Sequence, residues 1–81
     1  MKKIVILGAG ESGTGAAILA QSKGMEVFVS DRGTIAPMYQ ALLNQHQINW
    51  EEGQHSTEKI LAADEVIKSP GIPFSAPIVQ Q

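Results

Sequence analysis

The chain lacks cysteine altogether, which excludes disulfide bonds and thiolate metal sites. Basic residues are not in excess, because six lysines and arginines stand against eight acidic residues and the net charge is -2. This charge gives no reason to expect nucleic acid or an anionic membrane as a partner. The first apolar run ends at Gly8, too early for an export signal or a membrane span. We therefore expect a cytoplasmic protein that binds neither nucleic acid nor membranes.

The usual sequence patterns of metal and catalytic sites are also missing. His46 and His55 lie in polar stretches without the spacing of metal ligands, and we expect both at the surface. Trp50 is expected to serve core or edge packing rather than stacking on a ligand. The sequence contains no P-loop, no nucleophile elbow and no acid and base at a catalytic spacing. We expect no catalytic residue and no metal site in this chain.

The length of 81 residues leaves room for one small domain, residues 1–81. A domain of this size buries roughly 60–65% of its unfolded surface, so we expect marginal stability. Residues 75–81 have the cap residue and early proline typical of a helix start, and the sequence ends there. We therefore expect a piece of a longer protein.

Hydrophobic runs typical of strands alternate with helix-like stretches along the chain. The predicted strands are 3–7, 26–30, 48–51 and 65–68, and the predicted helices are 14–23, 37–44 and 56–62. Gly24 is expected to end the first helix, and Ser56 to cap the third. This order predicts an α/β fold with a Rossmann-like, doubly wound parallel sheet. The expected strand order is 3-2-1-4, within three αβα layers.

A glycine-rich turn, Gly8-Ala9-Gly10-Glu11-Ser12-Gly13, follows the first predicted strand. Its free backbone N–H groups and the helix start behind it favour a phosphate. Gly10 would let a ligand approach the backbone, Gly13 would allow close packing, and Ser12 can donate its hydroxyl. Glu11 would repel a pyrophosphate, so it faces either solvent or a neutral ring. The alternative is that these glycines only let the helix pack on the sheet.

Two charged residues follow the second predicted strand. Asp31 lies 21 positions after Gly10, where an acid binds a ribose or a base edge in nucleotide-binding folds. Its alternative role is that of a turn residue that caps the next segment. Arg32 is suited to a phosphate, including the 2′-phosphate of NADP, or is a solvated loop charge.

The third loop, Lys68–Pro73 (KSPGIP), follows the fourth predicted strand. Two prolines stiffen it, Gly71 permits close approach, and the Ser69 hydroxyl can meet a planar ring edge-on. Because the first and fourth strands flank the switch point of the sheet, this loop and the glycine turn should form two lips of one crevice. The alternative is a rigid connection without a ligand.

Taken together, GAGESG, VSDRG and ADEVIKSPGIP, in this order and spacing, resemble the N-terminal domain of the Mur ligase family. The resemblance covers nearly the whole chain, although Gly33 stands where many members have a polar residue. It implies a bacterial domain that holds the UDP part of UDP-MurNAc-L-alanine. The implied site comprises Gly10, Glu11, Ser12 and Gly13 at the uridine and diphosphate, Asp31 and Arg32 at the uracil, and Ser69, Pro70 and Gly71 over the nucleoside.

The resemblance also implies what the whole enzyme does. Such a ligase uses ATP and Mg²⁺ to convert the alanyl carboxylate to an acyl phosphate, which the amine of D-glutamate attacks. The ATP and amino-acid sites belong to further domains, so this chain is expected to bind substrate without catalysis, as a monomer and without a cofactor. Two rival hypotheses are the NAD(P)-binding half of a dehydrogenase and a regulatory module that has lost its ligand.

Overall fold

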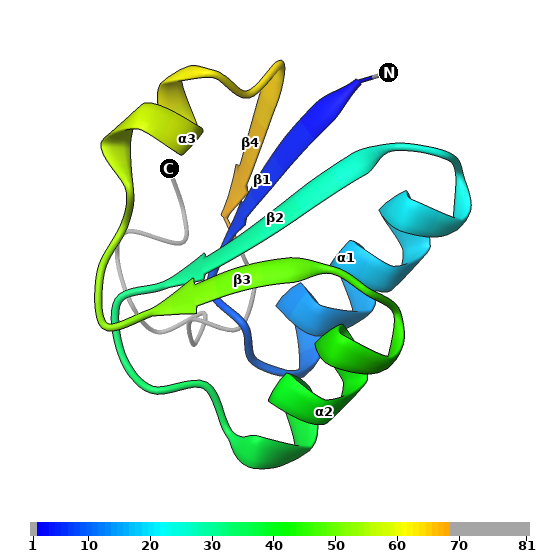
Figure 1. The fold of residues 1–81 in the computed structure, drawn as a ribbon, viewed down its shortest axis with the longest axis vertical. Helices are drawn as coiled ribbons and strands as arrows, with labels where there is room; N and C mark the ends of the chain where they lie inside the picture. Colours follow the sequence, from blue (N-terminus) through cyan, green and yellow to red (C-terminus); the bar gives the residue numbers. More distant parts are fainter. Residues whose placement is uncertain (1, 69–81) are drawn as a thin grey trace, which may run out of the picture.

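The computed structural model describes residues 2–68, and within them four parallel strands form one sheet in the order β3-β2-β1-β4. The strands are β1 (Lys3–Leu7), β2 (Glu26–Asp31), β3 (Asn49–Glu52) and β4 (Glu65–Lys68); the helices are α1 (Glu11–Ser22), α2 (Pro37–Gln45) and α3 (Thr57–Leu61). Helices α1 and α2 cover one face of the sheet and α3 lies on the other (Figure 1). The predicted Rossmann-like fold, its strand order and its three layers are confirmed.

The hydrophobic core lies between the sheet and the pair α1 and α2. In β1, Ile4 and Ile6 point to this face, and their register partners in β2 are Val27 and Val29. Leu43 of α2 is fully buried against them. The period-2 alternation of a strand therefore places one set of branched side chains under two helices.

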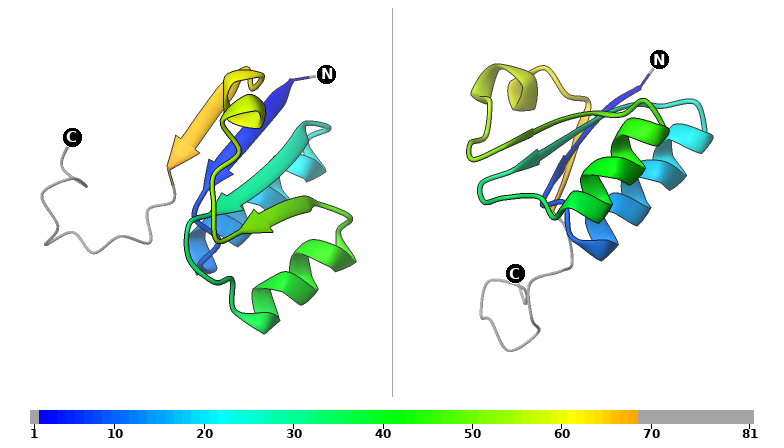
Figure 2. Two further views of the ribbon diagram at one scale, coloured as in Figure 1. Left: turned by 60° about the vertical axis from the view of Figure 1, so that its left-hand side comes forward. Right: turned by 60° about the horizontal axis from the view of Figure 1, so that its bottom comes forward.

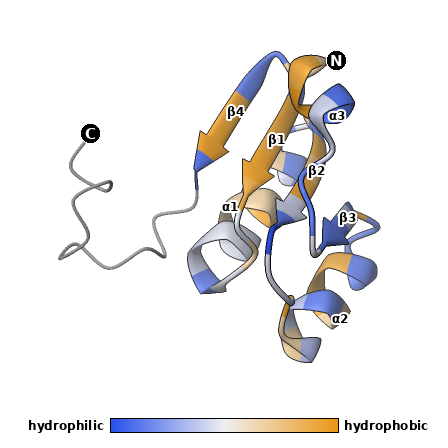
Figure 3. Cartoon of the chain, turned by 90° about the vertical axis from the view of Figure 1, so that its left-hand side faces the viewer, coloured by the Kyte–Doolittle hydropathy of each residue, from blue (hydrophilic) through white to orange (hydrophobic). Residues whose placement is uncertain are grey.

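Strand β3 forms an edge of the sheet and is far more polar than the other strands. Figure 3 shows it as hydrophilic, whereas β1 and β4 are largely hydrophobic. Its sequence is Asn-Trp-Glu-Glu, and Trp50 is its one residue packed against the core. The packing role predicted for Trp50 is confirmed. Two adjacent carboxylates on an edge strand also disfavour pairing with another chain.

The carboxyl ends of all four strands lie along one edge of the sheet, since every pairing is parallel (Figure 2). The loops predicted to bind a ligand begin at this edge. Strand β4 lies beside β1, and Lys68 is the register partner of Leu7. Lys68 is therefore placed next to the start of the glycine turn. The loop that follows Lys68 and the helix start predicted at 75–81 lie outside the described residues.

The prediction that the first helix begins at Thr14 is wrong, because α1 begins at Glu11. Gly10 occupies the N-cap position in an extended conformation, and its carbonyl accepts the Thr14 N–H at 2.9 Å. Gly13 and Gly15 both lie within the helix, where glycine is unfavourable. Their low helix propensity made the first turn resemble a loop in the sequence.

Other element ends differ from the prediction by one or two residues. Gly24 follows the α1 C-cap with φ +85°, as expected of a helix stop, and α1 itself ends at Ser22. Strand β3 begins at Asn49, one residue later than predicted. The N–H group of Ile48 instead donates to the carbonyl oxygen of Leu43 in the turn after α2. Ser56 occupies the α3 N-cap, but its hydroxyl bonds Glu51 instead of the helix. Among residues 2–68, no helix is long and apolar enough to cross a membrane.

Gly15→Ala is expected to stabilise the domain by about 0.5–1 kcal/mol. Gly15 is exposed within α1, and a Cβ there would meet no atom within 4 Å. Alanine therefore restricts the unfolded chain without a clash in the folded one. Urea denaturation of both proteins measures the difference. An unchanged or lower midpoint would contradict this placement of Gly15.

Candidate functional site

The glycine turn joins β1 to α1 at the carboxyl edge of the sheet. Gly8 has φ +105°, a conformation that glycine adopts without strain. Ala9 is buried, and its carbonyl accepts the Thr14 hydroxyl at 3.3 Å. The chain then enters α1 directly, so the first N–H groups of a 12-residue helix face this edge without partners inside the helix. Such a helix start favours an anionic group.

Gly10 is a bare position at this helix start. Its backbone angles, φ -79° and ψ -164°, are open to any residue, and a Cβ would meet no atom within 4 Å. Neither backbone conformation nor packing among the described residues therefore requires glycine here. The missing side chain leaves open space at the start of α1.

The carboxylate of Asp31 holds the glycine turn from the end of β2. Ala9 N–H donates to Asp31 Oδ2 at 2.8 Å, and Gly33 N–H donates to Asp31 Oδ1 at 2.8 Å. The second bond closes a turn of the kind that aspartate favours, so the turn role predicted for Asp31 is confirmed. The contact of Asp31 with a ligand stays a prediction. It requires the carboxylate to keep these two hydrogen bonds and to accept a third one from the ligand.

The other predicted site residues differ in their surroundings. Glu11 and Ser12 are exposed in the first turn of α1, where the acidic side chain is favourable toward the helix dipole. Gly13 is buried in the same turn. Arg32 is exposed and, within residues 2–68, takes part in no ion pair. The structure brings these four residues to one edge together with Gly10 and Asp31. The remaining predicted residues, Ser69, Pro70 and Gly71, lie outside the described part.

A polar cluster that the sequence did not reveal lies beneath the same edge. Ser30 is fully buried, and its hydroxyl oxygen lies 2.9 Å from Glu51 Oε2 and 2.5 Å from His55 Nδ1. Glu51 also accepts the Ser56 N–H and the Ser56 hydroxyl, each at 2.6 Å. His55 is thus half-buried and bonded, which differs from the surface position predicted for it. Ser30 is 21 positions from Glu51 and 25 positions from His55, and no local pattern connects it to them.

Glu51 is ionised in this setting. Partial burial raises the pKa of its carboxyl group, but the hydrogen bonds from Ser56 and Ser30 and the positive charge of Lys59 outweigh this effect. The net pKa lies below the ordinary value for glutamate. Because the folded pKa is below the unfolded one, protonation favours the unfolded chain. Glu51 therefore adds stability above the unfolded pKa, and that stability is lost as the pH falls through the folded pKa.

Glu51→Gln is expected to flatten the loss of stability in acid. The parent should lose stability from about pH 5 downward, near the ordinary glutamate pKa of about 4.3, while the variant loses less over the same interval. At pH 7 the variant should have a lower free energy of unfolding than the parent, because its amide group replaces one acceptor oxygen. Urea denaturation at several pH values gives both slopes. Parallel slopes for the two proteins would contradict the lowered pKa of Glu51.

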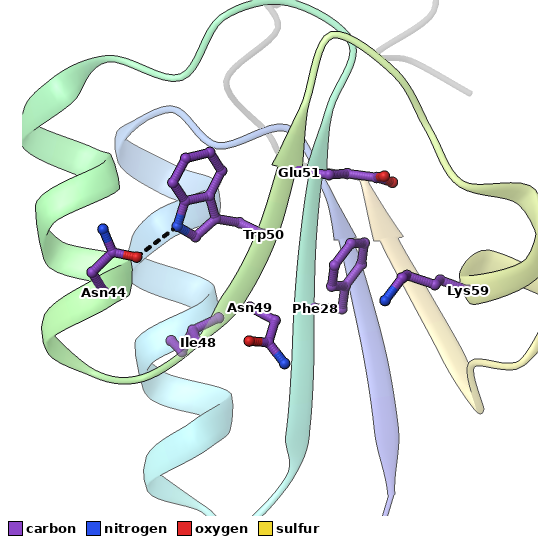
Figure 4. Close-up of a pocket in the computed structure, with 7 residues that line it drawn as sticks. All are labelled: Phe28, Asn44, Ile48, Asn49, Trp50, Glu51 and Lys59. Carbon is purple, nitrogen blue, oxygen red and sulfur yellow. Dashed lines mark hydrogen bonds between the residues drawn. The ribbon is translucent and has the colours of Figure 1, made fainter.

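The hollow drawn in Figure 4 lies along β3, away from the glycine turn. It has a volume of about 390 Å³ and is lined by Phe28, Asn44, Ile48, Asn49, Trp50, Glu51 and Lys59. Trp50 Nε1 donates to Asn44 Oδ1 at 2.9 Å, and Lys59 Nζ lies 4.5 Å from the Phe28 ring centre. Four of the lining side chains thus interact in two pairs, Trp50 with Asn44 and Lys59 with Phe28. None of the predicted ligand residues lines this hollow.

The parallel sheet and the glycine turn, which is bonded to the Asp31 carboxylate at the end of β2, define a Rossmann-like α/β domain. A family model described as the MurD N-terminal domain matches residues 3–77. The chain belongs to the MurD N-terminal domain family. This confirms the resemblance seen in the sequence motifs.

Relatives named UDP-N-acetylmuramoylalanine–D-glutamate ligase match nearly the whole chain. The protein of Bacteroides thetaiotaomicron is 65% identical over 79 residues, which cover 98% of this chain and 18% of the relative. The protein of Porphyromonas gingivalis strain W83 is 63% identical over 78 residues, covering 96% and 17%. That of Christiangramia forsetii is 54% identical over 78 residues, covering 96% and 18%. The chain thus spans less than a fifth of the length of these curated relatives.

Proposed function

We propose that this chain is the N-terminal domain of a UDP-N-acetylmuramoylalanine–D-glutamate ligase and binds the UDP part of UDP-MurNAc-L-alanine. The observation that carries this proposal is the bare Gly10 at the start of α1, which neither packing nor backbone conformation explains. A ligand that approaches the backbone at this point does explain it. The names of the relatives supply the substrate class.

The proposed contacts follow from the position of each residue along the sheet edge. The N–H groups of Glu11, Ser12 and Gly13 face the diphosphate at the helix start, where the Ser12 hydroxyl adds a donor. Asp31 accepts an N–H group of the uracil edge, and Arg32 lies beside it in solvent. Ser69, Pro70 and Gly71, which follow β4 in the sequence, are proposed to contact the nucleoside, as the family resemblance implies.

The chemistry belongs to the whole ligase. The whole ligase would transfer the γ-phosphoryl group of ATP, held with Mg²⁺, to the alanyl carboxylate and release ADP. The amine of D-glutamate would then attack the acyl carbon, expel inorganic phosphate and lose a proton to form the amide bond. Within residues 2–68 no group of three acidic or histidine side chains lies close enough to hold a metal ion. We propose substrate binding as the role of this domain, in a cytoplasmic, monomeric enzyme of peptidoglycan precursor synthesis. Because the chain spans less than a fifth of the length of its relatives, we expect no ligase activity from it alone.

Isothermal titration calorimetry with four ligands tests the proposal. UDP-MurNAc-L-alanine and UDP should both give saturable binding, because the site recognises the part that they share. ADP serves as a control with the same diphosphate and the wrong base, and should bind more weakly. NADPH should give no binding. Saturable binding of NADPH without binding of UDP would replace the proposal with a dehydrogenase domain.

A further inference from the structure

Ser30 lies where two structural links of the sheet edge meet. Its carbonyl accepts the Gly8 N–H at 2.7 Å and so holds the start of the glycine turn. Its hydroxyl contacts Glu51 of β3, and Gln54 and His55 of the segment between β3 and α3. The next residue, Asp31, holds Ala9. A shift of Ser30 would therefore move both contacts of the glycine turn.

The number of available hydrogens assigns the ring nitrogens of His55. The Ser30 hydroxyl has one hydrogen, whereas Glu51 Oε2 at 2.9 Å and the Gln54 carbonyl oxygen at 3.0 Å can only accept. If His55 Nδ1 also accepted, three acceptors would compete for one hydrogen. Ser30 is fully buried, so an unpaired group in this cluster would be costly. His55 Nδ1 therefore carries a hydrogen and donates it to Ser30.

We propose that Ser30, Glu51 and His55 are positioning residues for the UDP site, with His55 donating from Nδ1 to fix the end of β2. This inference rests on the proposed function. None of the three side chains needs to touch the ligand. Their effect passes through the Ser30 carbonyl to Gly8 and through Asp31 to Ala9. Loss of the Nδ1 donor should loosen those two backbone contacts together.

A pair of amide substitutions at His55 separates this role from general packing. In His55→Asn, the side-chain amide nitrogen can replace Nδ1 as the donor, whereas the longer side chain of His55→Gln places it nearer to Nε2. We expect His55→Asn to keep UDP affinity within about twofold and His55→Gln to lose about tenfold. Amide hydrogen exchange at Gly8 and Ala9 should quicken about tenfold in His55→Gln alone. Equal behaviour of the two variants would overturn the proposal.

The unmodified chain provides a second test that does not depend on folding of a variant. The ¹⁵N shifts of an imidazole ring show which of its two nitrogens carries a hydrogen. The proposal requires the hydrogen of His55 on Nδ1, and a hydrogen on Nε2 alone would refute it. If the parent chain binds no UDP, the proposed function fails. In that case the tautomer and the exchange at Gly8 and Ala9 still decide whether this cluster positions the turn.

Discussion

Gly10→Thr is expected to weaken binding of UDP-MurNAc-L-alanine at least about tenfold, with little change in the stability of the fold. The threonine side chain would occupy the space over the glycine turn that the ligand needs. The fold should tolerate it, because φ is -79°, ψ is -164° and a Cβ meets no atom within 4 Å. Threonine also matches glycine as an N-cap residue, so α1 loses no capping energy.

Calorimetry and urea denaturation on the same preparation separate the two effects. Gly15→Ala is a suitable control, because it adds a Cβ to another open position, five residues further along in α1. The control should keep the affinity of the parent within about twofold. If Gly10→Thr binds the UDP compound as tightly as the parent, the ligand does not lie over Gly10 and the proposed site is wrong.

Leu43→Ala should lower the free energy of unfolding by about 2–5 kcal/mol. Leu43 is 0% exposed in the core between α2 and the sheet, so its removal leaves a cavity. A domain of this size has little stability in reserve, and the variant should be largely unfolded at 37 °C, a temperature at which small domains are already weakened.

Leu19→Ala is the matched control for this core substitution. It makes the same change in helix α1, but Leu19 is 58% exposed. Its effect should stay within about 0.5 kcal/mol. Circular dichroism with urea measures both variants. Similar losses for Leu19→Ala and Leu43→Ala would contradict the core described between α1, α2 and the sheet.

The fold was largely predictable because its main signals are local. The β-branched run Lys3–Leu7 and the run Glu26–Ser30 identify the two central strands, and the alternation with helices leads to a parallel sheet. The start of α1 was missed because Gly13 and Gly15 lower helix propensity, while the capping position of Gly10 depends on the turn before it. Tertiary context decided that boundary.

The candidate site was only partly predictable. The glycine turn and Asp31 follow a known spacing. The sequence could not show that each carboxylate oxygen of Asp31 accepts a hydrogen bond from a backbone N–H group. An Asp31→Asn substitution would therefore turn an amide donor toward one of those N–H groups. Ser30 and His55 were missed for a different reason. They meet only after the sheet has formed, and neither belongs to a motif.

The most direct test of the proposed UDP site is an NMR titration of the ¹⁵N-labelled chain with UDP-MurNAc-L-alanine. Binding at the carboxyl edge predicts shifts in the amides of residues 8–13 and 31–33, and in those of Ser69 and Gly71. The amides at the end of α2, residues 42–45, should stay unchanged, because the chain there enters β3 at the opposite, amino edge of the sheet. Shifts confined to the hollow along β3, around Trp50 and Lys59, or the same edge responding to NADPH alone, would contradict the proposed site.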